Sequence, residues 1–120
     1  MSPFVPAPVK PAVPLSLLQQ VDIRVGTIVA AADVQGSDRL VELTVHLGDH
    51  TRQILAGMKQ ERADPQAIVG RQALFVVNLE PRRMLRRISE GMLFDIGAPD
   101  GLIPVLAVPE VPIPDGAQAG

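Results

Sequence analysis

The chain of 120 residues has no cysteine, tryptophan or tyrosine, and its three phenylalanines are its only aromatic residues. The absence of cysteine excludes disulfides, thiolate catalysis and cysteine-ligated zinc. The two histidines, His46 and His50, could hold a metal only together with carboxylates. We therefore expect neither a metal nor another cofactor. Proteins that bind single-stranded nucleic acid commonly stack bases on aromatic side chains, so the composition disfavours a general single-strand-binding protein.

Long apolar runs are also missing. None approaches the ~20 residues that a membrane-spanning helix requires, and Met1 is not followed by the basic and then apolar pattern of a signal peptide. We expect a cytoplasmic protein with no membrane partner. The length suits a single domain. Frequent prolines at the start of the chain predict a Pro-rich tail over residues 1–14, followed by a domain over residues 15–120.

Positive charge is absent after Arg87. Residues 1–87 hold all eleven Lys and Arg against eight acids, whereas residues 88–120 hold five acids and no base. The net charge of −2 argues against binding of nucleic acid by bulk charge. The asymmetry instead predicts one cationic face and one anionic segment.

Alternating apolar residues predict a β protein. Between residues 40 and 47, Val41, Leu43, Val45 and Leu47 should share one buried face. By similar patterns, strands are predicted over residues 21–30, 40–47, 51–56, 72–78 and 91–96, with a further strand-like stretch over 102–108. Gly26 lies inside the first of these strands and predicts a bulge or a tight bend there.

A single short helix is predicted between the third and fourth strands. Asp64 supplies an N-cap, Pro65 a first helical residue and Gly70 a stop. This order favours an all-β fold, a five-stranded OB barrel with one short helix between strands 3 and 4 and a partly extended C-terminal extension. A generic β-sandwich would give similar strands, and the position of the helix is the feature that discriminates between the two.

Several blocks of the sequence match, in order and in spacing, the motifs of the OB-fold tRNA-binding domain family. The blocks are residues 22–29, which resemble D-I/L-R-V-G-x-I; 37–40, A-D-K/R-L; 45–49, V-D-L-G-D; 52–57, R-Q-I-V-S/A-G; 69–71, V-G-K/R; 78–83, N-L-x-P-R/K-K/R; and 89–93, S-E/Q-G-M-L. The resemblance covers residues 21–111, which is nearly the whole predicted domain.

This resemblance implies a barrel over about residues 21–97 and a C-terminal dimerisation extension over about 98–120. It implies a non-catalytic homodimer that binds tRNA, with an aminoacyl-tRNA synthetase as a further candidate partner. Free-standing members of the family include CsaA-type proteins described as secretion chaperones. The resemblance of this chain to the CsaA-type proteins implies an alternative function, which is the binding of unfolded peptides.

The chain departs from the family pattern at two places. Val34 and Gln35 stand where relatives usually have His-Pro, so a role of that His does not carry over. Arg86 and Arg87 stand where relatives have Gly and an apolar residue.

The strongest functional candidate is the cluster of Arg82, Arg83, Arg86 and Arg87. Arginine forks match phosphate oxygens in a bidentate way, and a loop at a barrel rim can present several together. About four neutralised phosphates would give a slope of about −3 to −4 in log affinity against log salt. The alternative is that these arginines pair with nearby acids, such as those at positions 80 and 90.

Further RNA-binding candidates flank the cluster or share its predicted groove; they are Arg24, Arg52, Lys59, Asn78 and Ser89. Asn78 could contact a base edge or pin the loop, and Ser89 could bind a phosphate or cap a turn. Catalytic residues are not evident, because Ser89 has no neighbouring histidine and the carboxylates are scattered. The sequence therefore predicts a binding module and not an enzyme.

Overall fold

Strand β1 (Ile23–Asp33) organises the sheet, because it pairs with different neighbours along its length. The computed structural model describes residues 4–60 and 62–120. The other elements are α1 (Leu15–Leu18), β2 (Leu40–His46), β3 (Thr51–Gly57), η1 (Pro65–Ile68), β4 (Gln72–Val76), β5 (Arg82–Met84), β6 (Arg87–Ser89), β7 (Met92–Leu93), β8 (Asp95–Ile96), η2 (Ala98–Asp100), β9 (Val105–Leu106) and β10 (Gln118–Ala119).

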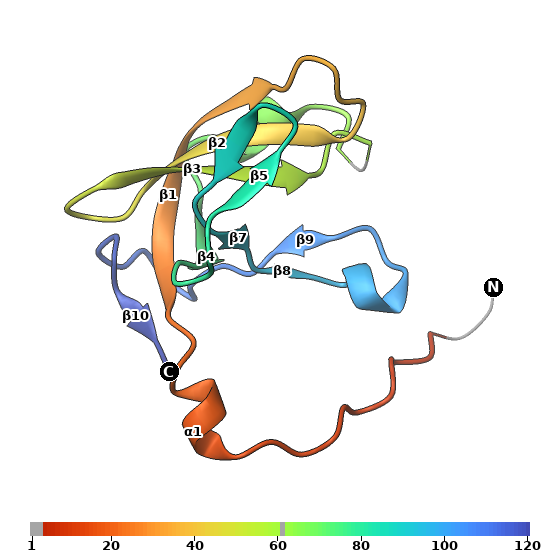
Figure 1. The fold of residues 1–120 in the computed structure, drawn as a ribbon, viewed down its shortest axis with the longest axis vertical. Coiled ribbons are helices and arrows are strands. Elements are labelled where there is room, and N and C mark those ends of the chain that lie inside the picture. The colour runs from red at the N-terminus through yellow and green to blue at the C-terminus, as the bar shows by residue number, and fades with distance from the viewer. Residues whose placement is uncertain (1–3, 61) are drawn as a thin grey trace.

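The main sheet has the order β3-β2-β1-β4-β7 and is antiparallel (Figure 1). The first half of β1 pairs with β4 and the second half pairs with β2, so the strand serves both sides of the barrel. The predicted strands over residues 21–30, 40–47, 51–56 and 72–78 become β1 to β4, and the predicted strand over 91–96 is divided into β7 and β8. The all-β OB-like fold is therefore confirmed.

Of the two alternatives predicted at Gly26, a bulge or a tight bend, the bulge is wrong. Gly26 pairs in regular register with Ala73, and the irregularity lies between Ile28 and Ala30. Gly26 is required for another reason: a Cβ atom there would lie 2.6 Å from Cγ1 of Val45. β2 crosses β1 too closely for any side chain at this point.

The apolar core lies inside the sheet and follows the predicted alternation. Val41, Leu43, Val45 and Leu47 are all buried, and Phe75 is completely buried at the centre. Each such side chain contributes about 1.5–3 kcal/mol relative to exposure.

The predicted short helix is present as η1, a 3-10 turn. The Asp64 carboxylate accepts a hydrogen bond from the backbone N–H of Gln66 at 3.0 Å, and Pro65 occupies the first turn, as the sequence predicts. Ile68 is the buried residue of this turn and closes one end of the core.

Ser89, at the end of β6, and Glu90, which follows it, are hydrogen-bonded to β3. The regular strand pairing of the main sheet does not extend to this place. The Ser89 hydroxyl accepts from the Leu55 N–H at 3.0 Å and donates to the Gly91 carbonyl at 2.9 Å. The Glu90 carboxylate accepts from the Gln53 N–H at 3.0 Å, while the Glu90 N–H donates to the Gln53 carbonyl at 2.9 Å. These bonds complete the barrel in place of a regular strand pair.

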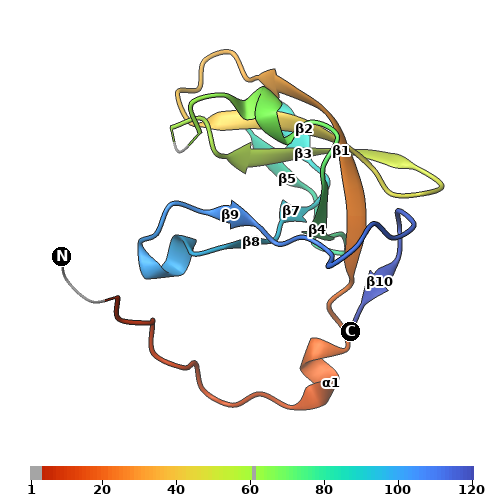
Figure 2. The same ribbon diagram turned by 180° about the vertical axis from the view of Figure 1, so that it is seen from behind.

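The C-terminal extension returns to its own barrel. After the β8–β9 hairpin, the chain crosses β1 and β4, and β10 pairs with the start of β1 (Figures 1 and 2). The Asp115 carboxylate accepts from the Thr27 hydroxyl at 2.7 Å and from the Gln72 amide at 2.9 Å. A Cβ atom on Gly116 would lie 2.5 Å from the Leu47 carbonyl oxygen, so the extension sits directly against the β2–β3 turn.

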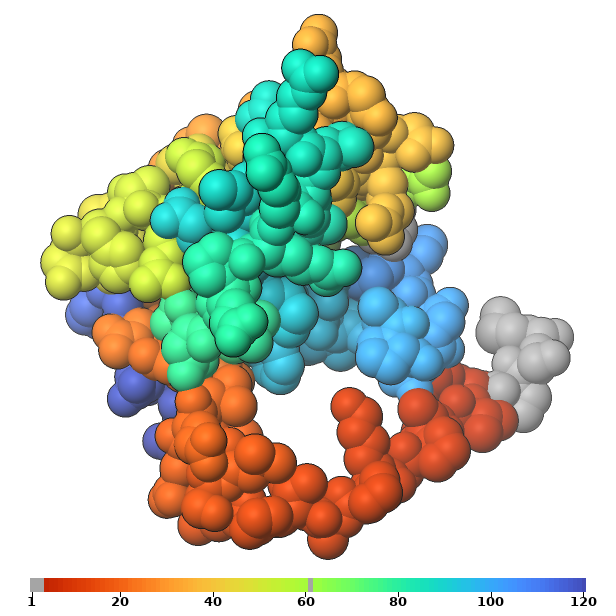
Figure 3. All heavy atoms as spheres, in the orientation of Figure 1, coloured from red at the N-terminus to blue at the C-terminus, as the bar shows by residue number. Residues whose placement is uncertain are grey.

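Residues 4–14 form an exposed arm without helix or strand. Residues 1–3 of the predicted Pro-rich tail lie outside the described part of the chain. The Ala7 N–H donates to the Asp100 carboxylate at 2.6 Å. Between that contact and α1 the arm arches away from the barrel across open space (Figure 3). Across the described residues, no helix is long and apolar enough to cross a membrane.

Replacing Ser89 with Ala should lower the free energy of unfolding by about 1–3 kcal/mol, because the buried Leu55 N–H loses its acceptor. Urea denaturation measures the change. Ser16→Ala, at an exposed helix position, should stay within about 0.5 kcal/mol of the wild type. Equal effects of the two substitutions would contradict the closing role of Ser89.

Candidate nucleic-acid interface

The arginine cluster lies on a β-hairpin and not on the predicted rim loop. Strands β5 and β6 pair with Arg82 opposite Ser89, Arg83 opposite Ile88 and Met84 opposite Arg87. Because opposite residues share a face, Met84 lies on the same face as the buried Ser89, and Arg83 lies on the other, solvent-facing side.

Two contacts fix the hairpin to the barrel. Met84 packs against a small core of Val34, Leu40 and Leu55, which joins the hairpin to the β1–β2 loop. Arg87 donates to the Glu42 carboxylate on β2 at 2.8 Å. The arginine side chains are therefore presented by an anchored element.

Three arginines of the cluster are exposed and available. Within residues 4–60 and 62–120, Arg82, Arg83 and Arg86 make no hydrogen bond or ion pair through their side chains, whereas Arg87 pairs with Glu42. The acids that the sequence offered as alternative partners do not take these arginines. Glu90 instead accepts from the backbone of Gln53.

The hairpin tip carries a local strain. Leu85 has a φ of 56°, in the left-handed region that disfavours residues with a side chain, and its side chain is 56% exposed. This conformation costs roughly 1–2 kcal/mol.

A groove of about 680 Å³ separates the hairpin tip from the β1–β2 loop. Its lining residues are Val34, Gln35, Gly36, Leu85, Arg86 and Arg87. In OB folds the loops at these two positions are the ones that commonly bind oligonucleotides. Of the three unpaired arginines, Arg86 lines this groove. Figure 3 shows the hairpin on the outer face of the barrel, next to the β1–β2 loop.

Arg24 is engaged inside the chain. Its guanidinium donates to both oxygens of the Asp22 carboxylate, at 3.0 and 3.1 Å, and Gln118 donates to the same carboxylate at 3.0 Å. The hydrogen bonds from Arg24 and then from Gln118 lower the pKa of Asp22, and the bond to Asp22 raises the pKa of Arg24. The pair therefore ties the start of β1 to β10.

Arg52 is likewise held within the fold. It donates to the carbonyls of Val77 and Glu90 and to the ring of His50 at 3.2 Å. The His50 ring also bonds the Asp49 carboxylate at 2.7 Å, which lowers the pKa of Asp49. Arg52 thus links β3 to the end of β4 and to the closing segment.

The remaining candidates are bonded to the backbone. Lys59 donates to the Ser37 carbonyl at 2.8 Å. The Asn78 amide accepts from the Asp22 N–H at 2.8 Å and donates to the Gln20 carbonyl at 2.6 Å, which pins the start of β1 to the end of β4. Ser89 is buried, with both bonds of its hydroxyl made inside the barrel. The structure does not bring these side chains to the groove.

Two residues of the β1–β2 loop escaped the sequence prediction. Arg39 is exposed in the β1–β2 loop and makes no side-chain bond within the described part of the chain. Its backbone carbonyl accepts from the Lys59 N–H at 3.0 Å. Gln35 lines the groove itself. Arg39 belongs to the block resembling A-D-K/R-L, and its charge was the available signal.

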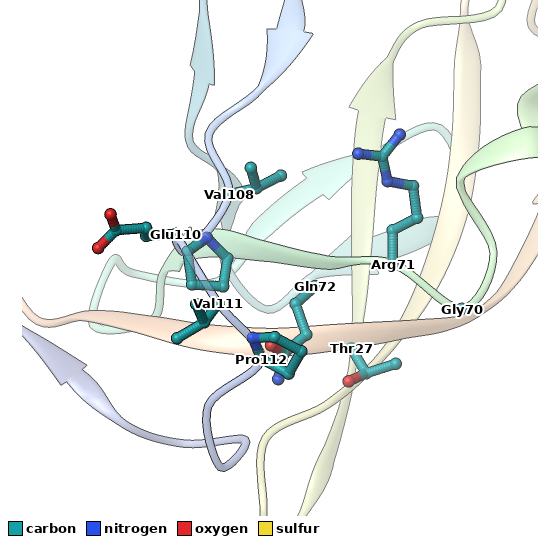
Figure 4. Close-up of a pocket in the computed structure, with 9 residues that line it drawn as sticks. Thr27, Gly70, Arg71, Gln72, Val108, Glu110, Val111 and Pro112 are labelled. Carbon is teal, nitrogen blue, oxygen red and sulfur yellow. The ribbon is translucent and has the colours of Figure 1, made fainter.

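A second hollow, of about 330 Å³, lies between β1, β4 and the C-terminal extension (Figure 4). Its polar residues serve the extension: Gln72 exchanges hydrogen bonds with the backbone of Ile113 at 2.6 and 3.2 Å, and Thr27 bonds Asp115. Arg71 is exposed, and Figure 4 shows its side chain turned away from Gln72 and Thr27. Among the residues described, no group of three or more His, Asp or Glu side chains could hold a metal ion.

Comparison with known proteins matches residues 23–118 to the family described as "Putative tRNA binding domain". Two methionine–tRNA ligases of Acidithiobacillus ferrooxidans are 40% identical over 110 residues, which cover 92% of this chain and 15% of each ligase. The chain thus corresponds to a small part of those enzymes.

Two solved structures share the fold. A methionyl-tRNA-synthetase-related protein from Pyrococcus horikoshii superposes with a TM-score of 0.84 at 25% identity, covering 92% of this chain and all of that one. The chaperone CsaA from Bacillus anthracis superposes with a TM-score of 0.77 at 24% identity, with the same coverage.

The Asp22–Arg24 pair predicts a pH dependence of stability. A carboxyl whose pKa is lowered in the folded state stabilises the fold above its unfolded pKa, and the contribution is lost as the pH falls through the folded value. The stabilities of Asp22→Asn and wild type, measured by chemical denaturation, should therefore differ most near neutral pH, and the difference should shrink as the pH falls through the lowered pKa of Asp22. Asp38→Asn, at an exposed loop position, is the control. A difference that does not change with pH would contradict the role of the pair.

Proposed function

The chain belongs to the tRNA-binding domain family, and we propose that it is a non-catalytic protein that binds tRNA through phosphates at the β5–β6 hairpin. The proposal is carried by one observation: Arg82, Arg83 and Arg86 stand exposed and without partners in the described residues, on an element anchored beside a groove. In a protein of net charge −2, such a concentration of free positive charge favours a local anionic ligand.

The free arginines and the bonded ones have different parts in this proposal. Arg82, Arg83 and Arg86 contact phosphates, and Arg39 on the β1–β2 loop is a further exposed cation. Arg87 holds the hairpin through Glu42. Arg24, Arg52, Lys59, Asn78 and Ser89, whose polar groups already bond within the chain, position the framework. Phosphate contacts fix register but carry no sequence information, so recognition depends on the shape of the tRNA.

A homodimer is part of the proposal. The outward face of the β8–β9 hairpin is apolar: Ile96 and Val105 lie opposite each other and are 55% and 54% exposed, next to Phe94 and Ile103. A contiguous apolar face of this kind suits a protein interface. Two copies would present two arginine hairpins, and the second contact of a bound tRNA would then be intramolecular.

The partner that fits this activity is an aminoacyl-tRNA synthetase. The ligases that match this chain contain the corresponding segment within a much longer protein. A module that holds tRNA near a synthetase raises the effective concentration of the substrate without any new catalytic group.

A second candidate function, the binding of unfolded peptides, is favoured by a separate feature. A groove of about 230 Å³ runs between β3 and β7 and is lined mainly by apolar residues, among them Met58 and Met92. Flexible methionine side chains adapt to varied apolar ligands. Such binding would persist at high salt, whereas phosphate binding would not.

Replacing Arg82, Arg83 and Arg86 together with Ala should weaken tRNA binding and reduce the slope of log affinity against log salt by about 2–3. The three side chains are exposed, so the fold should be retained. Gel-shift titration at several salt concentrations measures both effects. Arg71→Ala is the matched control, because it removes an exposed, unpaired arginine of the described residues that lies beside the C-terminal extension.

An unchanged salt slope in the triple variant would contradict the proposed contact. Binding of a permanently unfolded protein that survives both the triple substitution and high salt would support the peptide function instead. Absence of tRNA binding by the wild type at low salt would overturn the tRNA proposal.

Ile96→Asp should convert the dimer to a monomer, because two buried copies of the new carboxylate would face each other without a partner. Size-exclusion chromatography with light scattering measures the mass. Val29→Asp, at a position of β1 that is 48% exposed, is the control and should leave the mass unchanged. A wild-type protein that is monomeric at micromolar concentration would contradict this part of the proposal.

A further inference from the structure

The groove between the β1–β2 loop and the hairpin tip has a chemistry of its own. Its two walls come from residues far apart in sequence, Val34 to Gly36 on one side and Leu85 to Arg87 on the other. The shared core of Met84 and Val34 holds these walls together. The groove is therefore a built feature of the fold, and the role inferred for it rests on the proposed RNA-binding function.

The loop wall offers an unused hydrogen-bonding group beside open space. The Gln35 side chain is exposed and makes no bond to any described residue. A Cβ atom added to the neighbouring Gly36 would meet nothing within 4 Å, so the space beside this part of the loop is open. A free amide carries both donors and an acceptor, which can complement the edge of a nucleobase.

The hairpin wall presents the apolar side chain of Leu85, whose backbone is held in an unfavourable left-handed conformation. Glycine or asparagine suits the left-handed φ of 56° at Leu85, yet the chain places a leucine there and exposes it to the groove. Strained residues of this type are concentrated at functional sites, where the strained conformation is needed. The leucine side chain provides an apolar surface against which the face of a base can lie.

We propose that this groove receives one unpaired nucleotide of the bound RNA, whose base edge is read by Gln35, whose base face packs on Leu85 and whose phosphate meets Arg86. Stacking and pairing in a duplex hide both the face and the edge of a base, so a nucleotide must be looped out or unpaired to enter. With no aromatic residue in the lining, the groove is suited to one base and not to a stacked run.

The test compares two blunt-ended RNA duplexes, one fully paired and one that is identical except for a single bulged nucleotide. The wild type should prefer the bulged RNA. Gln35→Ala should reduce that preference about threefold to tenfold, the effect of losing one or two hydrogen bonds to the base. Gln19→Ala removes an exposed glutamine from the turn after α1 and should leave the preference unchanged.

Leu85→Gly separates binding from folding. Glycine relieves the left-handed backbone, so the midpoint of thermal unfolding should rise, while the preference for the bulged RNA should fall. A purely structural role of Leu85 would move stability and binding in the same direction.

The outcomes distinguish this inference from the function on which it rests. Equal binding of both RNAs by the wild type, lost in the triple arginine variant, would overturn the nucleotide site and retain phosphate binding. A preference that persists in both Gln35→Ala and Leu85→Gly would also overturn the site. No binding of either RNA would overturn the proposed function itself.

Discussion

The fold depends on the few hydrogen bonds by which Ser89 and Glu90 join the last part of the barrel to β3. Side-chain oxygens there accept from the backbone of β3, where a regular strand pair would have supplied carbonyls. The same short segment continues directly from β6, so the hairpin that bears the arginines is fixed by the bonds that complete the barrel. Gly91 allows this close approach, since a Cβ atom there would lie 2.8 Å from the Val76 carbonyl oxygen. The same hydrogen bonds therefore join the last part of the barrel to β3 and hold the cationic hairpin in place.

The positive charges of the chain fall into two groups. Arg24, Arg52 and Arg87 are bonded to acids or carbonyls and hold neighbouring strands together. Arg82, Arg83 and Arg86 have no such partner among the described residues, and they are the ones exposed on the hairpin. The sorting explains how a protein of net negative charge can still present a surface for an anionic ligand, because three arginines without partners in the described residues are gathered on one hairpin.

Periodicity was sufficient for the framework of the fold. The alternation from Val41 to Leu47 and the Asp64-Pro65 start of η1 are local signals, and local physics determined both elements. The site could be predicted less well from the sequence than the fold could. From the sequence alone, the polar side chains of Asn78 and Ser89 could equally have bound a ligand or a backbone group of the chain. Only the tertiary structure shows that they bond to the backbone of Asp22 and Leu55. The close crossing of β1 and β2 at Gly26, and the pairing of Arg87 with Glu42, likewise depend on residues distant in sequence.

The position of β10 has a consequence for folding kinetics. The start of β1 obtains its second neighbour from residues 116–119, almost the full length of the chain away, and Asp115 bonds Thr27 across a similar separation. Contacts of such high sequence separation slow folding, because the loop that joins them must be closed before they are gained. During synthesis the edge of β1 at Ile23 and Arg24 stays open until Gln118 and Ala119 have left the ribosome. The folded domain is thus protected at an edge that the nascent chain exposes until β10 has been made.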